Sequence, residues 1–313
     1  MSLSVLTVNL NPAIDDLIRV ENFAAGKDYR IRAAHATAGG KAINVSRTLQ
    51  CFGVKSLITG LIGGTNGKKL QWLLDRESLP HAFFPADGET RTNITIFDLK
   101  NHATTRLIEP GPVVSAKTSV LFTSKLSQLL VRCSWVVCSG SLPPGIADGF
   151  YATLLRRARK AGRLTAVDTS GPALVASVRA FPDLLKINQR ETEFLLGHKL
   201  SSLKAIKEAA TQLRSFVGWA VIISLAAQGA VGFDGKTIIW AMPPELKRHS
   251  PAVGCGDALL GAFIAASMEK QSFAEALRQG VAAGSASILG TLPGFFRRKD
   301  FQRISAKVQL KLL

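Results

Sequence analysis

Hydrophobic and polar residues follow two different periods along this chain, and together they predict an α/β fold. Short apolar runs such as 4–9, 135–138 and 220–224 are typical of buried strands. Between such runs, apolar residues recur every three to four positions, as in the helices expected at 147–161 and 202–216. Strands that alternate with helices in this way form a mostly parallel sheet with helices on both faces.

The same periods predict the remaining elements, with Asn188 to Glu191 opening one further helix and Asp234-Gly235 turning a hairpin. Further strands are expected at 54–63, 164–167 and 184–187, and further helices at 41–52, 66–79, 115–131, 256–269 and 273–289. No repeat or linker interrupts the order, so residues 1–313 are expected to form a single domain.

Two segments depart from this order. Residues 17–38 alternate without forming a long helix, and 91–97 with 104–109 form an alternating pair around the turn Lys100-Asn101. We expect both segments, about 12–38 and 88–110, to make a small discontinuous β lid over the ligand edge of the large sheet. Its edges could pair two chains into a homodimer.

A glycine-rich turn at 252–256 leads into the helix expected to begin at Gly256. Gly254 and Gly256 allow a tight turn, and the helix start directs several N–H groups at one point, which suits a phosphate. Asp257 in the first turn could take a proton from an attacking hydroxyl, or it could simply cap the helix. The dinucleotide-binding pattern fails because position 259 is Leu259, and no lysine lies in a P-loop.

Composition narrows the function classes. No apolar run reaches the roughly 18 residues that span a bilayer, and no signal pattern opens the chain. The four cysteines have no metal spacing, so a reducing, cytoplasmic setting is expected. The net charge of +17 raises the question of nucleic acid, but the densest basic run, 156–160, lacks aromatic neighbours. We expect no nucleic-acid or membrane partner, and a basic surface that attracts anionic substrates.

Seven segments, in order, resemble the PfkB, or ribokinase-like, family of sugar kinases. They are Asn11-Pro-Ala-Ile-Asp15, Gly39-Gly-Lys-Ala-Ile-Asn-Val45, Glu89-Thr-Arg-Thr-Asn93, Glu109-Pro-Gly-Pro112, Ser139-Gly-Ser-Leu-Pro143, Asn188-Gln-Arg-Glu191 and Gly254-Cys-Gly-Asp257. The resemblance implies a ribokinase-like α/β fold and an ATP-dependent sugar kinase. Within the family, these segments look most like the branch that phosphorylates phosphorylated ketohexoses, 1-phosphofructokinase and tagatose-6-phosphate kinase.

The resemblance also implies roles for individual residues. Asp257 would be the base, and the N–H groups from Val253 to Gly256, including those of Gly254 and Cys255, would form the anion hole. The sugar phosphate would be bound by Asp15, Gly39, Gly40, Lys41, Asn44, Arg91, Ser139 and Gly140, with Lys41 and Arg91 on the substrate's own phosphate. ATP would be bordered by Lys186, Asn188, Ser224, Gly229, Gly254 and Gly256. Asn188 and Glu191 would organise Mg²⁺, and a monovalent cation is a further candidate cofactor.

Three positions depart from the family's pattern and bear on the nucleotide pocket. Ile187 stands where the family usually has Pro, while Ala226 and Ala42 stand where Gly is common. A missing glycine matters most where φ is positive, since Ala there costs on the order of 1 kcal/mol.

Several functions remain open on the sequence. Fructose 1-phosphate is preferred over tagatose 6-phosphate as the acceptor, but the residues do not separate the two. A kinase of neutral sugars or nucleosides is disfavoured, because such substrates do not need both Lys41 and Arg91. A non-catalytic sugar-phosphate-binding relative is disfavoured by the retention of Asp257, Asn188 and Glu191.

Overall fold

The computed structural model describes residues 4–31, 34–246 and 253–313. Arg32 and Ala33 of the predicted lid segment, and Ala252 of the glycine turn, lie outside these ranges. No helix within these ranges is both long and apolar enough to cross a membrane.

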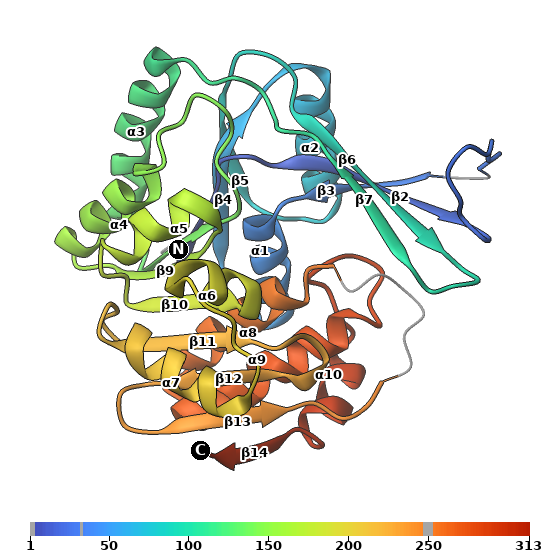
Figure 1. The fold of residues 1–313 in the computed structure, drawn as a ribbon. Helices are drawn as coiled ribbons and strands as arrows, with labels where there is room; N and C mark the ends of the chain where they lie inside the picture. Colours follow the sequence, from blue (N-terminus) through green and yellow to red (C-terminus); the bar gives the residue numbers. More distant parts are fainter. Residues whose placement is uncertain (1–3, 32–33, 247–252) are drawn as a thin grey trace.

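Ten strands of the described residues form one large sheet, the centre of the molecule (Figure 1). In spatial order they are β14 (Gln309–Leu312), β13 (Ile238–Met242), β12 (Ala230–Phe233), β11 (Ala220–Ser224), β10 (Leu184–Asn188), β9 (Leu164–Asp168), β8 (Trp135–Ser139), β1 (Val5–Asn9), β4 (Ser56–Ile62) and β5 (His81–Pro85). The pairing is parallel from β5 to β11 and antiparallel from β11 to β14. The mostly parallel sheet expected from the sequence is confirmed.

Helices cover both faces of this sheet, because strand residues point alternately to either side. In β8, Val136 and Cys138 join one apolar cluster, while Trp135 and Val137 join the other. The first face is covered by α3 (Ala116–Leu130), α4 (Phe150–Lys160), α5 (Gly171–Val178), α6 (Gln189–Leu196) and α7 (Leu203–Arg214). The second is covered by α1 (Lys41–Cys51), α8 (Cys255–Met268), α9 (Phe273–Ser287) and α10 (Arg298–Ser305).

A second sheet of four described strands projects beyond the large one (Figure 1). Its order is β3 (Ala34–Gly39), β2 (Ala13–Val20), β6 (Arg91–Asp98) and β7 (Thr104–Ile108). We call it the small sheet. β2 pairs with β6 in parallel, and β3 and β7 pair antiparallel on either side. Helix α2 (Gly64–Arg76) packs through Leu70 and Leu74 against the face of this sheet that carries Ile14 and Ala38.

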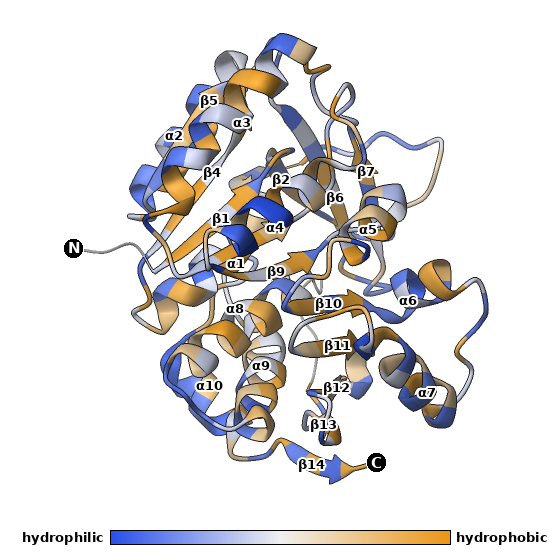
Figure 2. Cartoon of the chain, turned by 90° about the vertical axis from the view of Figure 1, so that its left-hand side faces the viewer, coloured by the Kyte–Doolittle hydropathy of each residue, from blue (hydrophilic) through white to orange (hydrophobic). Residues whose placement is uncertain are grey.

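The basic run on α4 is the solvent-exposed face of that helix. Arg156, Arg157, Arg159 and Lys160 are exposed, whereas the buried residues of α4 are Tyr151, Ala152, Leu154, Leu155 and Ala158. Figure 2 shows the same contrast, with hydrophobic colours along the central strands and hydrophilic ones on α4. Cations at the carboxyl end of a helix also offset its dipole.

Four elements and one boundary in the structure differ from those that the sequence predicts. β5, α5, α10 and β14 were not expected: they are short, and α5 begins with Gly171-Pro172, which looks like a turn. The alternation expected from residue 17 begins earlier, since β2 starts at Ala13 and so includes Asp15 and Asp16. Their alternation with Ile14 and Leu17 continues the pattern of the small sheet, which the Asn11-Pro12 break obscured.

Candidate active site

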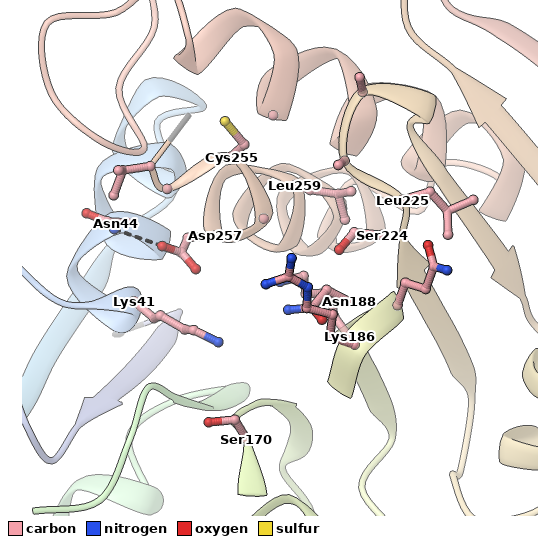
Figure 3. Close-up of a pocket in the computed structure, with 18 of the residues that line it drawn as sticks. Lys41, Asn44, Ser170, Lys186, Asn188, Ser224, Leu225, Cys255, Asp257 and Leu259 are labelled. Carbon is pink, nitrogen blue, oxygen red and sulfur yellow. Dashed lines mark hydrogen bonds between the residues drawn. The ribbon is translucent and has the colours of Figure 1, made fainter. Parts of the chain in front are cut away.

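A cleft of about 2000 Å³ opens at the carboxyl ends of the parallel strands and beneath the small sheet. Open α/β sheets bind ligands at this edge. The cleft is lined by α1, β10 and the turn before α8 (Figure 3), and by residues of the small sheet. Lys41, Asn44, Lys186 and Asp257 direct their side chains into the same space in this view.

The glycine turn has the predicted shape. Gly254 is the N-cap of α8, with φ of 80° in the left-handed region. A Cβ there would lie 2.8 Å from the Cβ of Pro293 and 3.0 Å from the backbone nitrogen of Gly294, so the turn needs glycine on both grounds. Cys255 opens the helix and Asp257 lies in its first turn. Gly254 has no side chain to cap the helix, and residues 253–257 line the cleft, so this helix start suits an anion.

Asp257 is a buried carboxyl group, 6% exposed. Its Oδ2 accepts a hydrogen bond of 2.8 Å from Nδ2 of Asn44. Burial, and next the nearby charge of Asp168, raise the pKa of Asp257 to about 6, against the opposing effects of Lys186, Lys41 and Asn44. A carboxylate with this pKa is a stronger base than an exposed aspartate and is still ionised at neutral pH, as a general base requires.

Two lysines meet on one buried carboxylate. Asp168, fully buried at the end of β9, lies 2.5 Å from Nζ of Lys186 and 2.7 Å from Nζ of Lys41. Burial would raise the pKa of Asp168, but the two ammonium groups hold it below its usual value. Burial would likewise lower the pKa of Lys41, but Asp168, Glu191 and Asp257 outweigh it and raise that pKa. Two fixed cations therefore lie beside Asp257.

The capping box at the start of α6 matches the predicted Asn188–Glu191 pair. Oδ1 of Asn188 accepts the N–H of Glu191 at 2.9 Å, and Oε2 of Glu191 accepts the N–H of Asn188 at 2.8 Å. Oε1 of Glu191 lies 3.4 Å from Nζ of Lys41. Among the described residues, no cluster of three or more His, Cys, Asp or Glu forms a metal cage. Mg²⁺ does not need one, since it commonly binds one or two protein carboxylates together with substrate phosphates and water.

The other end of the cleft is built by the small sheet. Asp15 accepts a hydrogen bond of 2.8 Å from Asn93, and burial raises the pKa of Asp15 against this bond. A Cβ on Gly39 would lie 2.2 Å from the Asp15 carboxyl group, so only glycine allows the close pairing of β3 with β2 here. Arg91 and Arg106 line the same part of the cleft. This part of the cleft therefore combines a carboxyl and an amide group, which can form hydrogen bonds, with two cations.

Arg91 is held in place by backbone carbonyls. Its Nε and Nη2 donate to the carbonyl of Asn11 at 3.2 and 2.8 Å, and its Nη1 donates to the carbonyl of Glu109 at 2.9 Å. Lys41, which the sequence paired with Arg91, instead directs its ammonium to Asp168 and Glu191, as above. The residue beside Arg91 is Arg106, whose charge acts on both Arg91 and Asp15.

Most of the remaining predicted residues also reach the cleft. The residues that line it include Gly40, Gly140, Ser224, Gly229, Cys255 and Gly256, but not Gly39, Ser139 or Glu191. Ser139 is fully buried, and its hydroxyl has no hydrogen-bond partner within the described residues.

The three departures from the family's pattern have different consequences. Ile187 is fully buried in β10, opposite Ile223 of β11. Ala42 is buried within α1, where a glycine is not needed. Ala226, however, has φ of 52° in the left-handed region, so the missing glycine costs backbone energy there.

Comparisons with known proteins decide the family. Residues 8–296 match the model of the pfkB family of carbohydrate kinases. This chain belongs to that family. As a pfkB carbohydrate kinase it is a phosphotransferase with an alcohol group as acceptor, and its family uses ATP and a divalent metal ion.

Relatives of this pfkB kinase cover nearly the whole chain. It is 36% identical to 1-phosphofructokinase of Rhodobacter capsulatus, over 89% of this chain and 88% of that protein. It is 30% identical to tagatose-6-phosphate kinase of Staphylococcus epidermidis, over 98% and 99% of the two chains. The tetrameric inhibited form of phosphofructokinase-2 from Escherichia coli has the same fold, with a TM-score of 0.88 and 30% identity over 97% and 99%.

The sequence predicts no role for some residues in or near this kinase's cleft. Arg106 and Asn93 share one face of the small sheet, and the alternation along 91–97 and 104–109 could have placed them there. Asp168 directly follows the strand expected at 164–167, and the sequence predicts no role for it. No local pattern marked Asp168 as a partner of Lys41, 127 residues away.

Proposed function

We propose that this pfkB kinase transfers the γ-phosphoryl group of ATP to a hydroxyl of a phosphorylated ketohexose, with fructose 1-phosphate as the preferred acceptor. The observation that supports this most is the joint placement of Arg91 and Arg106 beside Asp15 and Asn93 in the cleft that also holds Asp257. A neutral sugar has no group for two guanidinium cations, whereas a phosphorylated one does. The relative with 36% identity is named 1-phosphofructokinase.

In this mechanism Asp257 accepts the proton of the attacking hydroxyl as the new O–P bond forms. Asn44 aims the carboxylate through its hydrogen bond to Oδ2. The N–H groups of the turn from Val253 to Gly256 receive the negative charge of the transferring phosphoryl group. Catalysis is then mainly positioning and charge stabilisation, as expected for phosphoryl transfer.

We place Lys41 and Lys186 at the transferring phosphoryl group rather than at the sugar's own phosphate. Both ammonium groups are fixed by Asp168, close enough to Asp257 to act on its pKa. The sugar's own phosphate is then held by Arg91 and Arg106, which leaves Asp15, Gly40 and Gly140 for the sugar hydroxyls. Ser224 and Gly229 border the nucleotide.

Mg²⁺ would be held by Glu191, with Asn188 acting through water, in the capping box at the start of α6. When bound, Mg²⁺ neutralises charge on the phosphates during transfer. Oε1 of Glu191 lies 3.4 Å from Nζ of Lys41, a residue that lines the cleft, which fits a site shared with phosphate oxygens.

An assay of ADP release over a panel of acceptors tests the proposal. The panel contains fructose 1-phosphate, tagatose 6-phosphate, fructose 6-phosphate, fructose and ribose, each with Mg²⁺ and ATP. We expect the highest kcat/KM with fructose 1-phosphate. Higher kcat/KM with fructose or ribose contradicts the proposal. Replacing potassium by tetramethylammonium in the same assay tests the monovalent cation.

Tagatose 6-phosphate is the second candidate, because the relative named tagatose-6-phosphate kinase matches 98% of this chain. The same panel separates the two acceptors, since both are measured at equal ATP.

We also propose that two copies associate through the small sheet. All five residues of β7 are exposed, and Leu107 is 55% exposed on the face opposite Arg106. Changing Leu107→Lys is expected to convert dimers to monomers in sedimentation velocity. Val120→Lys is the control, because Val120 is 68% exposed on the distant helix α3. A monomeric wild type, or a Leu107→Lys dimer, contradicts this arrangement.

A further inference from the structure

Arg47 of α1 is a buried arginine, 2% exposed, whose hydrogen bonds use its whole guanidinium. Nε and Nη2 donate to the two carboxylate oxygens of Glu77 at 2.5 and 2.9 Å. Nη2 also donates to the carbonyl of Ala38 at 2.5 Å. Nη1 donates to Oδ1 of Asn44 at 2.8 Å and to the carbonyl of Pro293 at 3.3 Å. An arginine side chain has five N–H donors, so none is left over.

These bonds join three parts of the proposed active site. Ala38 precedes Gly39, whose backbone lies against the carboxyl group of Asp15. Pro293 packs against Gly254 of the glycine turn. Arg47 therefore connects the small sheet, helix α1 and the loop behind the turn, and its guanidinium has no freedom to turn away.

The bond to Asn44 fixes which way round its amide lies. Arginine has donors and no acceptor, so only Oδ1 of Asn44 can face Arg47. Nδ2 must then face Asp257, and it lies 2.8 Å from Oδ2 of that residue. An N–H donor favours the ionised carboxylate over the protonated acid. Without Arg47, the amide could turn over and present Oδ1 to Asp257, which favours the protonated acid.

We propose that Arg47 is a positioning residue that acts through its hydrogen bond to Asn44 to keep Asp257 ionised and aimed at the acceptor hydroxyl. The catalytic consequence rests on the proposed function, while the effect on Asp257 itself depends only on the hydrogen bonds described here.

The charged groups that face Asp257 are Asp168 from β9, Lys186 from β10 and Lys41 from α1. None of them is a hydrogen-bond partner of Arg47. A change at Arg47 that keeps its charge therefore reaches Asp257 mainly through Asn44. Losing a hydrogen bond to a carboxylate raises its pKa by roughly one unit.

The test is a pH titration of the Asp257 carboxyl carbon by NMR in protein carrying ¹³C-labelled aspartate, with the signal assigned from Asp257→Asn. Arg47→Lys keeps the charge but cannot bind Glu77 and Asn44 together. We expect it to raise the pKa of Asp257 by about one unit. Glu77→Gln is the matched control, because it weakens the same buried pair and leaves the bond from Arg47 to Asn44. We expect no shift of Asp257 in that variant.

An unchanged pKa of Asp257 in Arg47→Lys overturns the proposal, and so does an equal shift in Glu77→Gln. If Arg47→Lys does not fold, the double variant Arg47→Met/Glu77→Met replaces it, since swapping a buried ion pair for apolar side chains is often tolerated. The same upward shift is expected there, and its absence is equally contradictory.

Kinetics then separate this proposal from the proposed function. If the chain phosphorylates a sugar phosphate, kcat in Arg47→Lys should fall at pH 6 more than at pH 8, with little change in KM for ATP. If none of the five acceptors is phosphorylated by the wild type, the proposed function fails, while the NMR titration still decides the role of Arg47.

Discussion

Asp257→Asn should make the protein more stable at neutral and alkaline pH, although it removes the proposed base. Burial raises the pKa of Asp257 from 3.8 to about 6, which means that the folded state binds its proton more tightly than the unfolded chain. Between these two values the folded state holds more protons, so stability falls as pH rises. The ionised carboxyl group of Asp257 therefore lowers the free energy of unfolding above pH 6. Asparagine has the shape of the protonated acid and carries no such cost.

The size of the effect follows from the shift. A change of about two pKa units corresponds to about 3 kcal/mol, fully expressed above pH 7 and absent below pH 3. For a chain of 313 residues this raises Tm by roughly 5 °C. Thermal unfolding of wild type and Asp257→Asn, measured from pH 4 to pH 8, should show a difference that grows with pH. A difference that is constant with pH, or a less stable variant at pH 8, would refute the assignment of a raised pKa to Asp257.

Three further predictions concern other parts of the cleft. Arg91→Ala should raise KM for the sugar phosphate much more than KM for ATP, and a parallel rise in both would contradict a role for Arg91 at the sugar's own phosphate. Cys255, half-buried at the start of α8, should react with maleimide faster than the buried Cys133 and Cys138, and ATP with Mg²⁺ should slow its labelling in peptide mapping. Equal labelling of Cys255 with and without nucleotide would contradict the placement of the transferred phosphate at this turn. In urea unfolding, Ala226→Gly should stabilise the protein by about 0.5 to 1 kcal/mol because φ is positive at that position, whereas Ala42→Gly within α1 should destabilise it by about 1 kcal/mol. A change of the same sign in both variants would refute the argument from φ.

The parts of the site that were predictable from sequence are those made by neighbouring residues. The turn at Gly254, the first helical turn with Asp257 and the capping box from Asn188 to Glu191 each depend on a few consecutive positions. Local backbone rules suffice for such features. The alternating strands and helices were visible for the same reason, since each element's period is local.

The missed parts depend on contacts between distant residues. Lys41 and Asp168 are 127 residues apart, and Asn44 and Asp257 are 213 apart. The sequence therefore gave Lys41 a role beside Arg91, while the fold places its ammonium on Asp168. Arg47 carried no sequence signal at all, because its function depends on the convergence of Glu77, Pro293 and Ala38 around it.

The central claim is that Asp257 acts as the base in phosphoryl transfer to a phosphorylated ketohexose. The most direct measurement is kcat for ADP release with saturating fructose 1-phosphate, compared between wild type and Asp257→Asn, with ATP binding measured by calorimetry in both. Loss of a general base lowers the rate by about two to four orders of magnitude, and we predict a loss in this range with ATP affinity unchanged. Near-wild-type turnover in Asp257→Asn would contradict the account and leave Asp257 as a helix-start residue without a chemical role.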